Sequence, residues 1–417
     1  MISVLSSAWA LLLGMMLLQV GNGMQGTLLG VRGQIEGFST MEMSLVMGGY
    51  FVGFLFGSRM APDMIRRVGH VRVFAALASL ISAVMLLYPT FTDVWVWGAA
   101  RILVGFCFSG VYVTAESWLN NAATNENRGK ALSLYMMVQV LGIVAAQALV
   151  LTADPGGFVL FIIPSVLISL AFAPILLSIS PTPASENTKP MGLKELYQVS
   201  PLGCVGMLLL GVIFAVQFGM APVFATQAGL SIGQISTFVS MFFVGALVVQ
   251  FPLGWLSDRM DRRILILVAA SVGAAGACIG MLFTNTFVML AVSAFIVGGV
   301  SNPLYSLVIA YTNDFLDHDD MAAAASGLVF INGLGAVFGP LITGWIMGVV
   351  GPWGFFVVLA VFNVLIVAYA AYRMTQRAAP PVSDTDSYAV VAPSASPAAV
   401  AIAQEYAIET AQDDQNG

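Results

Sequence analysis

Long apolar stretches alternate with short polar or charged connections along most of this chain. About 20 apolar residues are needed for a helix to cross about 30 Å of hydrocarbon. Stretches of that length predict twelve transmembrane helices and thus an all-α integral membrane protein. The first has no Lys or Arg before it and is longer than a signal-peptide core, so we interpret it as a retained span. The approximate spans are 8 to 30, 44 to 60, 71 to 89, 94 to 119, 131 to 152, 158 to 179, 202 to 223, 234 to 256, 264 to 283, 287 to 311, 322 to 349 and 353 to 373.

The longest polar interruption, residues 181–200, separates the sixth predicted span from the seventh. We therefore predict an N-terminal six-helix bundle over 1–180, a cytoplasmic linker over 181–200 and a C-terminal six-helix bundle over 201–374. Residues 375–417 are rich in Ala, Pro, Ser and acidic side chains, which predicts a largely disordered acidic tail with at most a short helix near 398–411.

The basic residues indicate how the chain is oriented. Lys and Arg accumulate in short cytoplasmic loops. When both termini are placed in the cytoplasm, every basic residue except Arg32 and Arg101 falls at or beside the cytoplasmic face. The reverse topology would put all the others on the wrong side, so we predict cytoplasmic N and C termini.

Composition excludes several classes of protein. Hydrophobic residues make up 59% of the chain and charged residues 9%, whereas about a quarter of the residues in a water-soluble domain are charged. The net charge of −6 arises in the acidic tail, and no basic surplus is left to bind nucleic acid. The three cysteines lie in separate apolar segments and both histidines lie in charged loops, so we expect no disulfide, zinc site, catalytic triad or cofactor.

An internal repeat supports the division into two alike bundles. A shift of 192 positions superimposes the first parts of the two halves without a gap, and a shift of 193 superimposes later parts. The matched pairs include Gly53 with Gly245, Gly105 with Gly298, Gln25 with Gln217, Tyr112 with Tyr305, Gly142 with Gly335 and Gln139 with Asn332. Two parallel halves are typical of a transporter whose site lies between them.

A charged motif lies between the eighth and ninth predicted spans and reads Gly254-Trp-Leu-Ser-Asp258-Arg259-Met-Asp261-Arg262-Arg263. It matches GxLxDRxGRR with Asp261 at the second glycine, and it resembles the loop motif of the major facilitator superfamily. In such a motif the small residue allows close helix approach, while the Asp and Arg side chains pair across helix ends. The predicted cytoplasmic gate residues are Gly254, Asp258, Arg259, Arg262 and Arg263.

The N-terminal copy of this motif departs from the family pattern. Arg66 and Arg67 fall where the repeat has Asp258 and Arg259, so this side is either a differently paired gate or only a basic topology loop. In the fourth span, Glu116 followed by Arg128 and a glycine resembles the charge-relay motif of the family. The resemblance implies that Glu116 pairs at the gate with Arg128 or with basic residues of the two-three loop.

The fourth predicted span carries a polar stripe. Helical geometry places Arg101, Gly105, Ser109, Tyr112 and Glu116 within about 80° of one another. A buried Arg costs several kcal/mol unless it is paired or hydrated, which makes Arg101 a candidate for substrate recognition. The alternative is a structural Arg that is satisfied by backbone carbonyls.

Uncharged polar residues at membrane depth complete the predicted substrate pathway. The alternative for each of these residues is a structural role, in which its side chain forms a hydrogen bond to a neighbouring helix and contacts no substrate. Together with Arg101, the candidates are Asn22, Gln25, Ser109, Tyr112, Gln139, Gln217, Asn302, Tyr305 and Asn332.

The run YFVGFLFGSRMAPDMIRRVGHVRVFAAL and the motif QFPLGWLSDRMDRR resemble the YcaD-type branch of bacterial members of the superfamily. The resemblance implies a monomeric transporter of the bacterial inner membrane. We expect a secondary transporter that moves a small organic solute by alternating access. With Arg32 and Arg101 as the only deep or outer cations, an anion or zwitterion is preferred.

Other functions stay open at this point. No Asp or Glu lies at mid-depth in most spans, so coupling to a proton or another ion is not visible. A drug or metabolite exporter is disfavoured because the fifth span lacks GPxxGG, an element that the family resemblance associates with many drug/proton antiporters. A receptor or sensor without transport activity would need a signalling domain, and a membrane enzyme would need a catalytic cluster at membrane depth.

Overall fold

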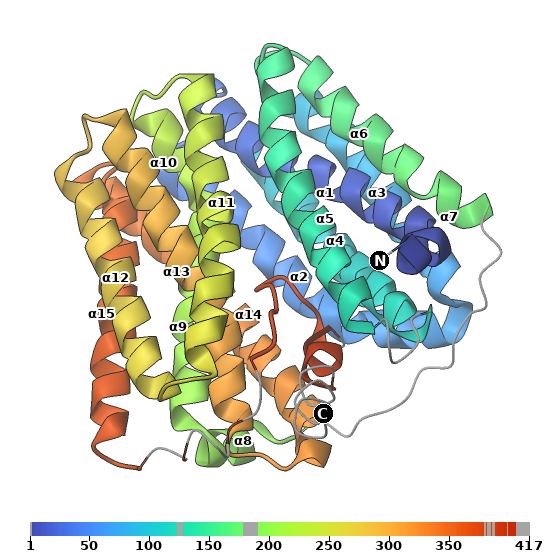
Figure 1. Ribbon diagram of the computed structural model, residues 1–417. Coiled ribbons are helices and arrows are strands. Elements are labelled where there is room, and N and C mark those ends of the chain that lie inside the picture. The colour runs from blue at the N-terminus through green and yellow to red at the C-terminus, as the bar shows by residue number, and fades with distance from the viewer. Residues whose placement is uncertain are drawn as a thin grey trace. The chain divides into compact units, whose positions relative to one another are not determined.

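The computed structural model describes residues 2–122, 128–177, 191–378, 381, 385, 388–397 and 399–405. Within these ranges, the side chains of residues 2–8, 120–122, 128–130, 318 and 319 are not described. The described chain is built from helices that follow one another along the sequence (Figure 1).

The described part of the first half contains six longer α-helices and one short one. They are α1 (Ile2–Ile35), α2 (Thr40–Val68), α3 (His70–Thr90), α4 (Val94–Ala122), α5 (Arg128–Leu149), α6 (Val159–Ala171) and α7 (Ala173–Leu177). α2 begins at a capping box, in which the amide of Glu42 donates to Ser39 Oγ and the Glu42 carboxylate accepts from the Ser39 amide. α2 continues past its predicted end at residue 60 as far as Val68, where Gly69 adopts a φ of 85°.

The described part of the second half contains eight α-helices. They are α8 (Leu193–Val199), α9 (Pro201–Ala215), α10 (Ala221–Gln227), α11 (Ile232–Ser257), α12 (Arg262–Leu282), α13 (Phe287–Asn313), α14 (His318–Val350) and α15 (Gly354–Met374). A π-helical turn, Val216–Met220, joins α9 to α10. Pro222 follows this turn and has no amide hydrogen to bond the preceding turn, which accounts for the local change of helix type.

Eleven helices of the described residues are long and apolar enough to cross a membrane. The remaining predicted span, residues 8 to 30, lies within α1. The sequence prediction of an all-α membrane protein with twelve transmembrane helices in two pseudo-symmetric bundles is thus confirmed.

The chain forms two compact units. Unit 1 contains Met1–Glu186, Phe218–Ser240 and Pro340–Pro352, and unit 2 contains Asn187–Gln217, Met241–Gly339 and Trp353–Gly417. In unit 1, α2 packs along α4, while α1 packs on α5 and α6. In unit 2, α12 lies beside α13 and α15 (Figure 1). The predicted linker 181–200 contains α8, and its residues 181–190 lie outside the described chain.

Two glycines bring the backbones of α2 and α4 together in unit 1. A Cβ atom at Gly53 would overlap the carbonyl oxygen of Ile102, and a Cβ atom at Gly105 would overlap that of Tyr50. The helices therefore cross with backbone against backbone, a geometry that only glycine permits at these two positions.

The repeat reproduces this crossing in unit 2. A Cβ atom at Gly245 would overlap the carbonyl oxygen of Phe295, and one at Gly298 would overlap that of Phe242. Each of these four residues is the repeat partner of one in the α2–α4 crossing, at a shift of 192 or 193 positions. The repeat of the sequence is thus a repeat of contacts.

Candidate functional site

Arg101 is buried in unit 1 and incompletely bonded. Its side chain lies on α4 with no exposed surface. Nη2 lies 3.6 Å from Met47 Sδ, and the guanidinium carbon lies 4.8 Å from the centroid of the Tyr50 ring. Nε and Nη1 have no hydrogen-bond partner among the described residues. A cation–π contact alone leaves most of the donor capacity of a guanidinium unused.

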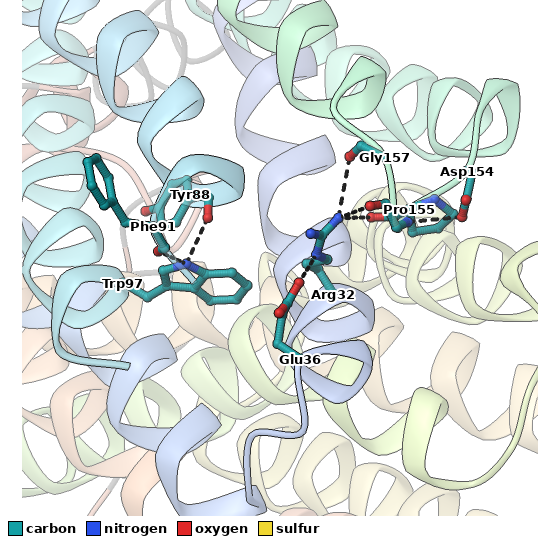
Figure 2. A network of polar contacts seen from close by, with 9 residues as sticks. Arg32, Glu36, Tyr88, Phe91, Trp97, Asp154, Pro155 and Gly157 are labelled. Carbon is teal, nitrogen blue, oxygen red and sulfur yellow. Dashed lines mark hydrogen bonds and ion pairs between the residues drawn. The ribbon is translucent and has the colours of Figure 1, made fainter. Parts of the chain in front are cut away.

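Arg32, the other basic residue outside the predicted cytoplasmic face, is bonded through Nε and Nη1 (Figure 2). Its Nε donates to Glu36 Oε1 at 2.6 Å, and Nη1 donates to the carbonyl oxygens of Pro155, Gly156 and Gly157. Arg32 is thus a structural arginine satisfied by backbone carbonyls, the role that was the alternative for Arg101. It joins the end of α1 to the turn before α6.

A chain of side-chain hydrogen bonds crosses unit 1 from α5 to α2. Gln19 Nε2 donates to Gln139 Oε1 at 2.7 Å, and the hydroxyl of Tyr112 donates to Gln19 Oε1 at 2.7 Å. Asn22 Nδ2 then donates to the hydroxyls of Tyr112 at 3.1 Å and Tyr50 at 3.4 Å. The chain ends at the Tyr50 ring that Arg101 faces. Three predicted pathway residues, Asn22, Tyr112 and Gln139, thus lie together with Arg101.

Two further predicted residues of unit 1 lie beside this chain. Gln25 Nε2 donates to the hydroxyl of Tyr88 at 2.8 Å. The backbone around Tyr88 is held in turn by the Trp97 indole, which donates to the carbonyls of Tyr88 and Phe91 at 3.0 Å each (Figure 2). Ser109 is buried on α4, and its Oγ has no partner among the described residues.

Unpaired polar atoms in this region include both donors and acceptors. The acceptor atoms Asn22 Oδ1 and Gln25 Oε1 and the donor Gln139 Nε2 are buried without a partner in the described chain. Buried polar groups normally have hydrogen-bond partners, because an unpaired one costs about 1–3 kcal/mol. Unit 1 therefore holds a cluster, Asn22, Gln25, Arg101 and Gln139, with capacity to bind a charged polar ligand. We call it the Arg101 cluster.

The predicted pathway residues of unit 2 each make separate contacts. Gln217 is buried in the π-helical turn, and its Nε2 has no partner among the described residues. Asn302 Nδ2 donates to the carbonyl of Gly298 one turn earlier in its own helix. Asn332 Nδ2 donates to the carbonyl of Met207 on α9, and Tyr305 is buried on α13. The described hydrogen bonds do not join these four residues to one another.

The predicted gate residues of unit 1 have different environments. Arg66 forms an ion pair with Asp63 on the last turns of α2, and Arg67 is exposed. Glu116 is buried on α4 and accepts a hydrogen bond from the Tyr135 hydroxyl at 3.1 Å. Arg128 begins α5, and its side chain lies outside the described residues.

In unit 2, the gate motif between α11 and α12 is held by a buried ion pair. Arg262 pairs with Asp314 and also donates to Ser257 Oγ and the carbonyl of Ala310, both at 3.1 Å. Its Nη2 lies 3.8 Å from Asp258 Oδ1. The motif is thus anchored to the end of α13 mainly through Asp314.

The other two arginines of the motif differ in their contacts. Arg259 is held within its own segment, whereas Arg263 also donates from Nη1 to the carbonyl of Arg377, just past α15, at 2.5 Å. The Arg259 guanidinium lies over the Trp255 ring, 4.4 Å from its centroid. Arg263 pairs with Asp261 at 2.8 Å, and Asp261 also accepts from the Arg263 amide as the N-cap of α12. Burial opposes ionisation of Asp261, but the hydrogen bonds from Arg263 outweigh it and lower the pKa of this carboxyl.

An Asp314→Asn substitution is expected to lower the free energy of unfolding by about 3 kcal/mol, because it leaves the buried Arg262 without its counter-charge. Thermal unfolding of the purified protein measures this loss. Asp317→Asn is the matched control, since Asp317 is exposed in the same connection and should change little. Equal unfolding temperatures for the two variants would contradict the anchoring role of Asp314.

Sequence reasoning missed several residues of these sites. Gln19 and Tyr50 link the polar chain, Tyr88 bonds Gln25, and Asp314 anchors the gate motif. A signal existed for Gln19, which lies one helical turn before Asn22 and therefore on the same face of α1. Asp314 had none, because its partner is distant in the sequence.

The described residues contain no group of three or more His, Cys, Asp or Glu side chains that could hold a metal ion. The atoms of the Arg101 cluster that lack a partner in the described chain belong to a guanidinium and three amides, groups that recognise a ligand through charge and hydrogen bonds.

Residues 11–201 and residues 202–403 each match the sequence profile of the Major Facilitator Superfamily. The chain is 26% identical over 341 residues to an uncharacterised transporter of this type, YcaD from Escherichia fergusonii, and these residues are 81% of this chain and 88% of that protein. It is 25% identical to an uncharacterised transporter of the same type from an Enterobacter species, with the same shares covered.

Two solved structures share the fold. A bacterial homologue of the human lysosomal transporter Spinster, in an inward-facing and occupied conformation, superimposes with a TM-score of 0.72 at 15% identity over 91% of this chain and 98% of that one. The nucleoside transporter NupG gives a TM-score of 0.71 at 14% identity over 88% of this chain and 98% of that one.

Proposed function

Because this chain belongs to the Major Facilitator Superfamily and is a membrane transporter, we propose that it moves a small organic anion or zwitterion across the bacterial inner membrane by alternating access. Arg101 binds the negatively charged group of the solute in this proposal. Asn22, Gln25 and Gln139 bind its remaining polar groups.

The observation that carries the proposal is the buried guanidinium of Arg101, whose Nε and Nη1 have no partner in the described chain. An arginine at membrane depth is costly and marks a functional site unless it is otherwise satisfied. A carboxylate or phosphate matches the fork of guanidinium donors and would repay the desolvation of Arg101. Arg32 does not compete for this role, because Glu36 and three carbonyls already engage it.

Acceptors in the same cluster favour a solute with more than a bare negative charge. Asn22 Oδ1 and Gln25 Oε1 are acceptor atoms on α1, three residues apart, that are unpaired among the described residues, and each has capacity for a hydrogen bond from a ligand. A zwitterion or a hydroxylated anion would supply donors for them. This pairing is the reason to keep zwitterions in the proposed substrate class.

The distribution of basic residues supports cytoplasmic termini, and we propose that orientation for the protein in the membrane. The matched glycine crossings show that the two halves are built alike, and an internal repeat of this kind is typical of transporters that work by alternating access. We further propose a monomer. Coupling to a proton or ion, if present, would use a peripheral carboxyl such as Glu116.

A thermal-shift screen of the purified full-length protein tests the substrate class. The probes are benzoate, succinate, leucine and tetraphenylphosphonium, which represent monoanions, dianions, zwitterions and lipophilic cations. A ligand present at 100 times its dissociation constant stabilises the folded state by about 2.7 kcal/mol. We expect a shift with an anion or zwitterion, followed by uptake of that probe into proteoliposomes. A shift with tetraphenylphosphonium alone would contradict the proposal and favour an exporter of cationic drugs.

A further inference from the structure

Part of the C-terminal tail is bound to unit 2. The amide of Tyr388 donates to Asp258 Oδ1 at 2.8 Å. Its hydroxyl accepts from Gln250 Nε2 at 2.9 Å and donates to the Pro303 carbonyl at 3.2 Å. The ring lies against Gly254, where a Cβ atom would come within 2.8 Å of Tyr388 Cδ1. One tyrosine thus contacts both α11 and α13.

A second contact follows three residues later. The amide of Val391 donates to Ser306 Oγ, and the Ser306 hydroxyl donates to the Val391 carbonyl, each at 2.9 Å. Both residues are buried. The segment continues with buried residues, including Ala395 and Val400. Three backbone groups and one side chain of the tail are therefore hydrogen-bonded to unit 2, as expected for a bound peptide and not for a passing chain.

The segment lies on two parts of unit 2 that carry predicted functional residues, the gate motif and α13. Gly254 and Asp258 belong to the gate motif, and Asp258 is the carboxylate that the family resemblance assigns to pairing at helix ends. Ser306 follows Asn302 by one helical turn on α13, on the face that the repeat matches to Ser109 and Tyr112. The tail thus occupies a gate carboxylate and the predicted pathway face of α13 together.

We propose that α11 and α13 form a docking site for the C-terminal segment Tyr388–Val391, and that the docked segment restrains the gate and slows transport. The restraint rests on the proposed transport function, whereas the docking does not. The occupant is the tail of this chain itself, joined to α15 by a short connection. Such tethering gives effective concentrations of the order of mM, so a few hydrogen bonds suffice for occupancy.

Specificity for Tyr388 follows from three features of the site. Gly254 leaves room for the ring, Gln250 donates to the hydroxyl, and the Pro303 carbonyl accepts from it. Burial raises the pKa of the Tyr388 hydroxyl above its ordinary value, so it stays protonated and can donate. Removal of the phenol ring should release the segment without a change in the helices.

Thiol labelling measures the docking. Ala395→Cys is introduced into a variant whose native cysteines, Cys107, Cys204 and Cys278, are replaced by alanine, and N-ethylmaleimide is the probe. Ala395 is buried in the docked tail, and this substitution leaves both Ser306 contacts to Val391 in place. If the segment is docked about 90% of the time, Tyr388→Ala should raise the labelling rate about tenfold. A truncation after Ala378 removes the whole docked segment and serves in the uptake measurement. Val390→Ala is the matched control, because Val390 is 41% exposed between the two contacts.

Proteoliposome uptake of the probe identified by the thermal-shift screen measures the restraint. Tyr388→Ala and the truncated protein should transport faster by up to about tenfold, and Val390→Ala should match the wild-type rate. Unchanged labelling in Tyr388→Ala would overturn the docking site. Faster labelling with unchanged or slower uptake would overturn the restraint and leave the transport function intact. If none of the probes is transported, the substrate proposal fails, and the labelling ratio alone decides for or against docking.

Discussion

An Arg101→Met variant is expected to lose uptake of the wild-type substrate by about 100-fold or more, while its unfolding temperature rises. Loss of a charged hydrogen-bond partner costs about 1.5–3 kcal/mol of binding, and a poorly paired buried guanidinium destabilises the folded state. Replacement of buried ionic groups by apolar ones of similar volume often adds about 1–4 kcal/mol of stability. Thermal unfolding with and without ligand, together with uptake, measures both effects.

Arg32→Met is the matched control, because it removes a guanidinium whose Nε pairs with Glu36 and whose Nη1 donates to backbone carbonyls. This variant should unfold at a lower temperature, since Glu36 and the turn at Pro155–Gly157 lose their donor, and it should keep the substrate selectivity of the wild type. If Arg101→Met instead unfolded at a lower temperature and still transported, Arg101 would be a structural residue.

A Gly105→Ala substitution is expected to destabilise the protein by about 3 kcal/mol or more, or to abolish its folding. The added methyl group would overlap the carbonyl oxygen of Tyr50, and neither atom belongs to a side chain that could rotate away. The backbones of α2 and α4 would have to separate along their crossing. Size-exclusion chromatography of the detergent extract and thermal unfolding of any folded fraction measure the effect.

Gly98→Ala makes the same chemical change in the same helix, where a Cβ atom would have no neighbour within 4 Å. It should be neutral or stabilise the protein slightly, since alanine favours the helix over glycine by about 0.5–1 kcal/mol. Because of the repeat, Gly298→Ala should behave as Gly105→Ala does. Similar melting curves for the Gly98 and Gly105 variants would contradict the backbone crossing.

The helices were predictable from sequence because hydrocarbon thickness fixes the length of an apolar span, and a local count of residues measures that length. The repeat was predictable for a similar reason, since Gly53 and Gly105 recur at a fixed shift in the second half. Ends of helices were less predictable. α2 extends through Arg66 because polar residues do not stop a helix, and Gly69 does.

Partners of the candidate site residues were only partly predictable. Arg101 was identified because a charged residue within an apolar run is costly wherever its helix packs. That Tyr50 faces it depends on how α2 crosses α4, which no local pattern specifies. The pairing of Arg262 with Asp314 and the docking of Tyr388 on α11 likewise join segments far apart in the sequence. The acidic composition of the tail does not indicate that one tyrosine in it is bound.

The glycine crossings limit the kind of motion that each half can undergo. Shear motion requires a layer of side chains between two helices, so that one can slide over the other by small rotamer changes. No such layer separates α2 from α4 where Gly53 and Gly105 lie, nor α11 from α13 where Gly245 and Gly298 lie. Sliding there would drive carbonyl oxygens into the opposite backbone. Each crossed pair must therefore move as one rigid body, and conformational change has to occur by hinge bending elsewhere in the chain.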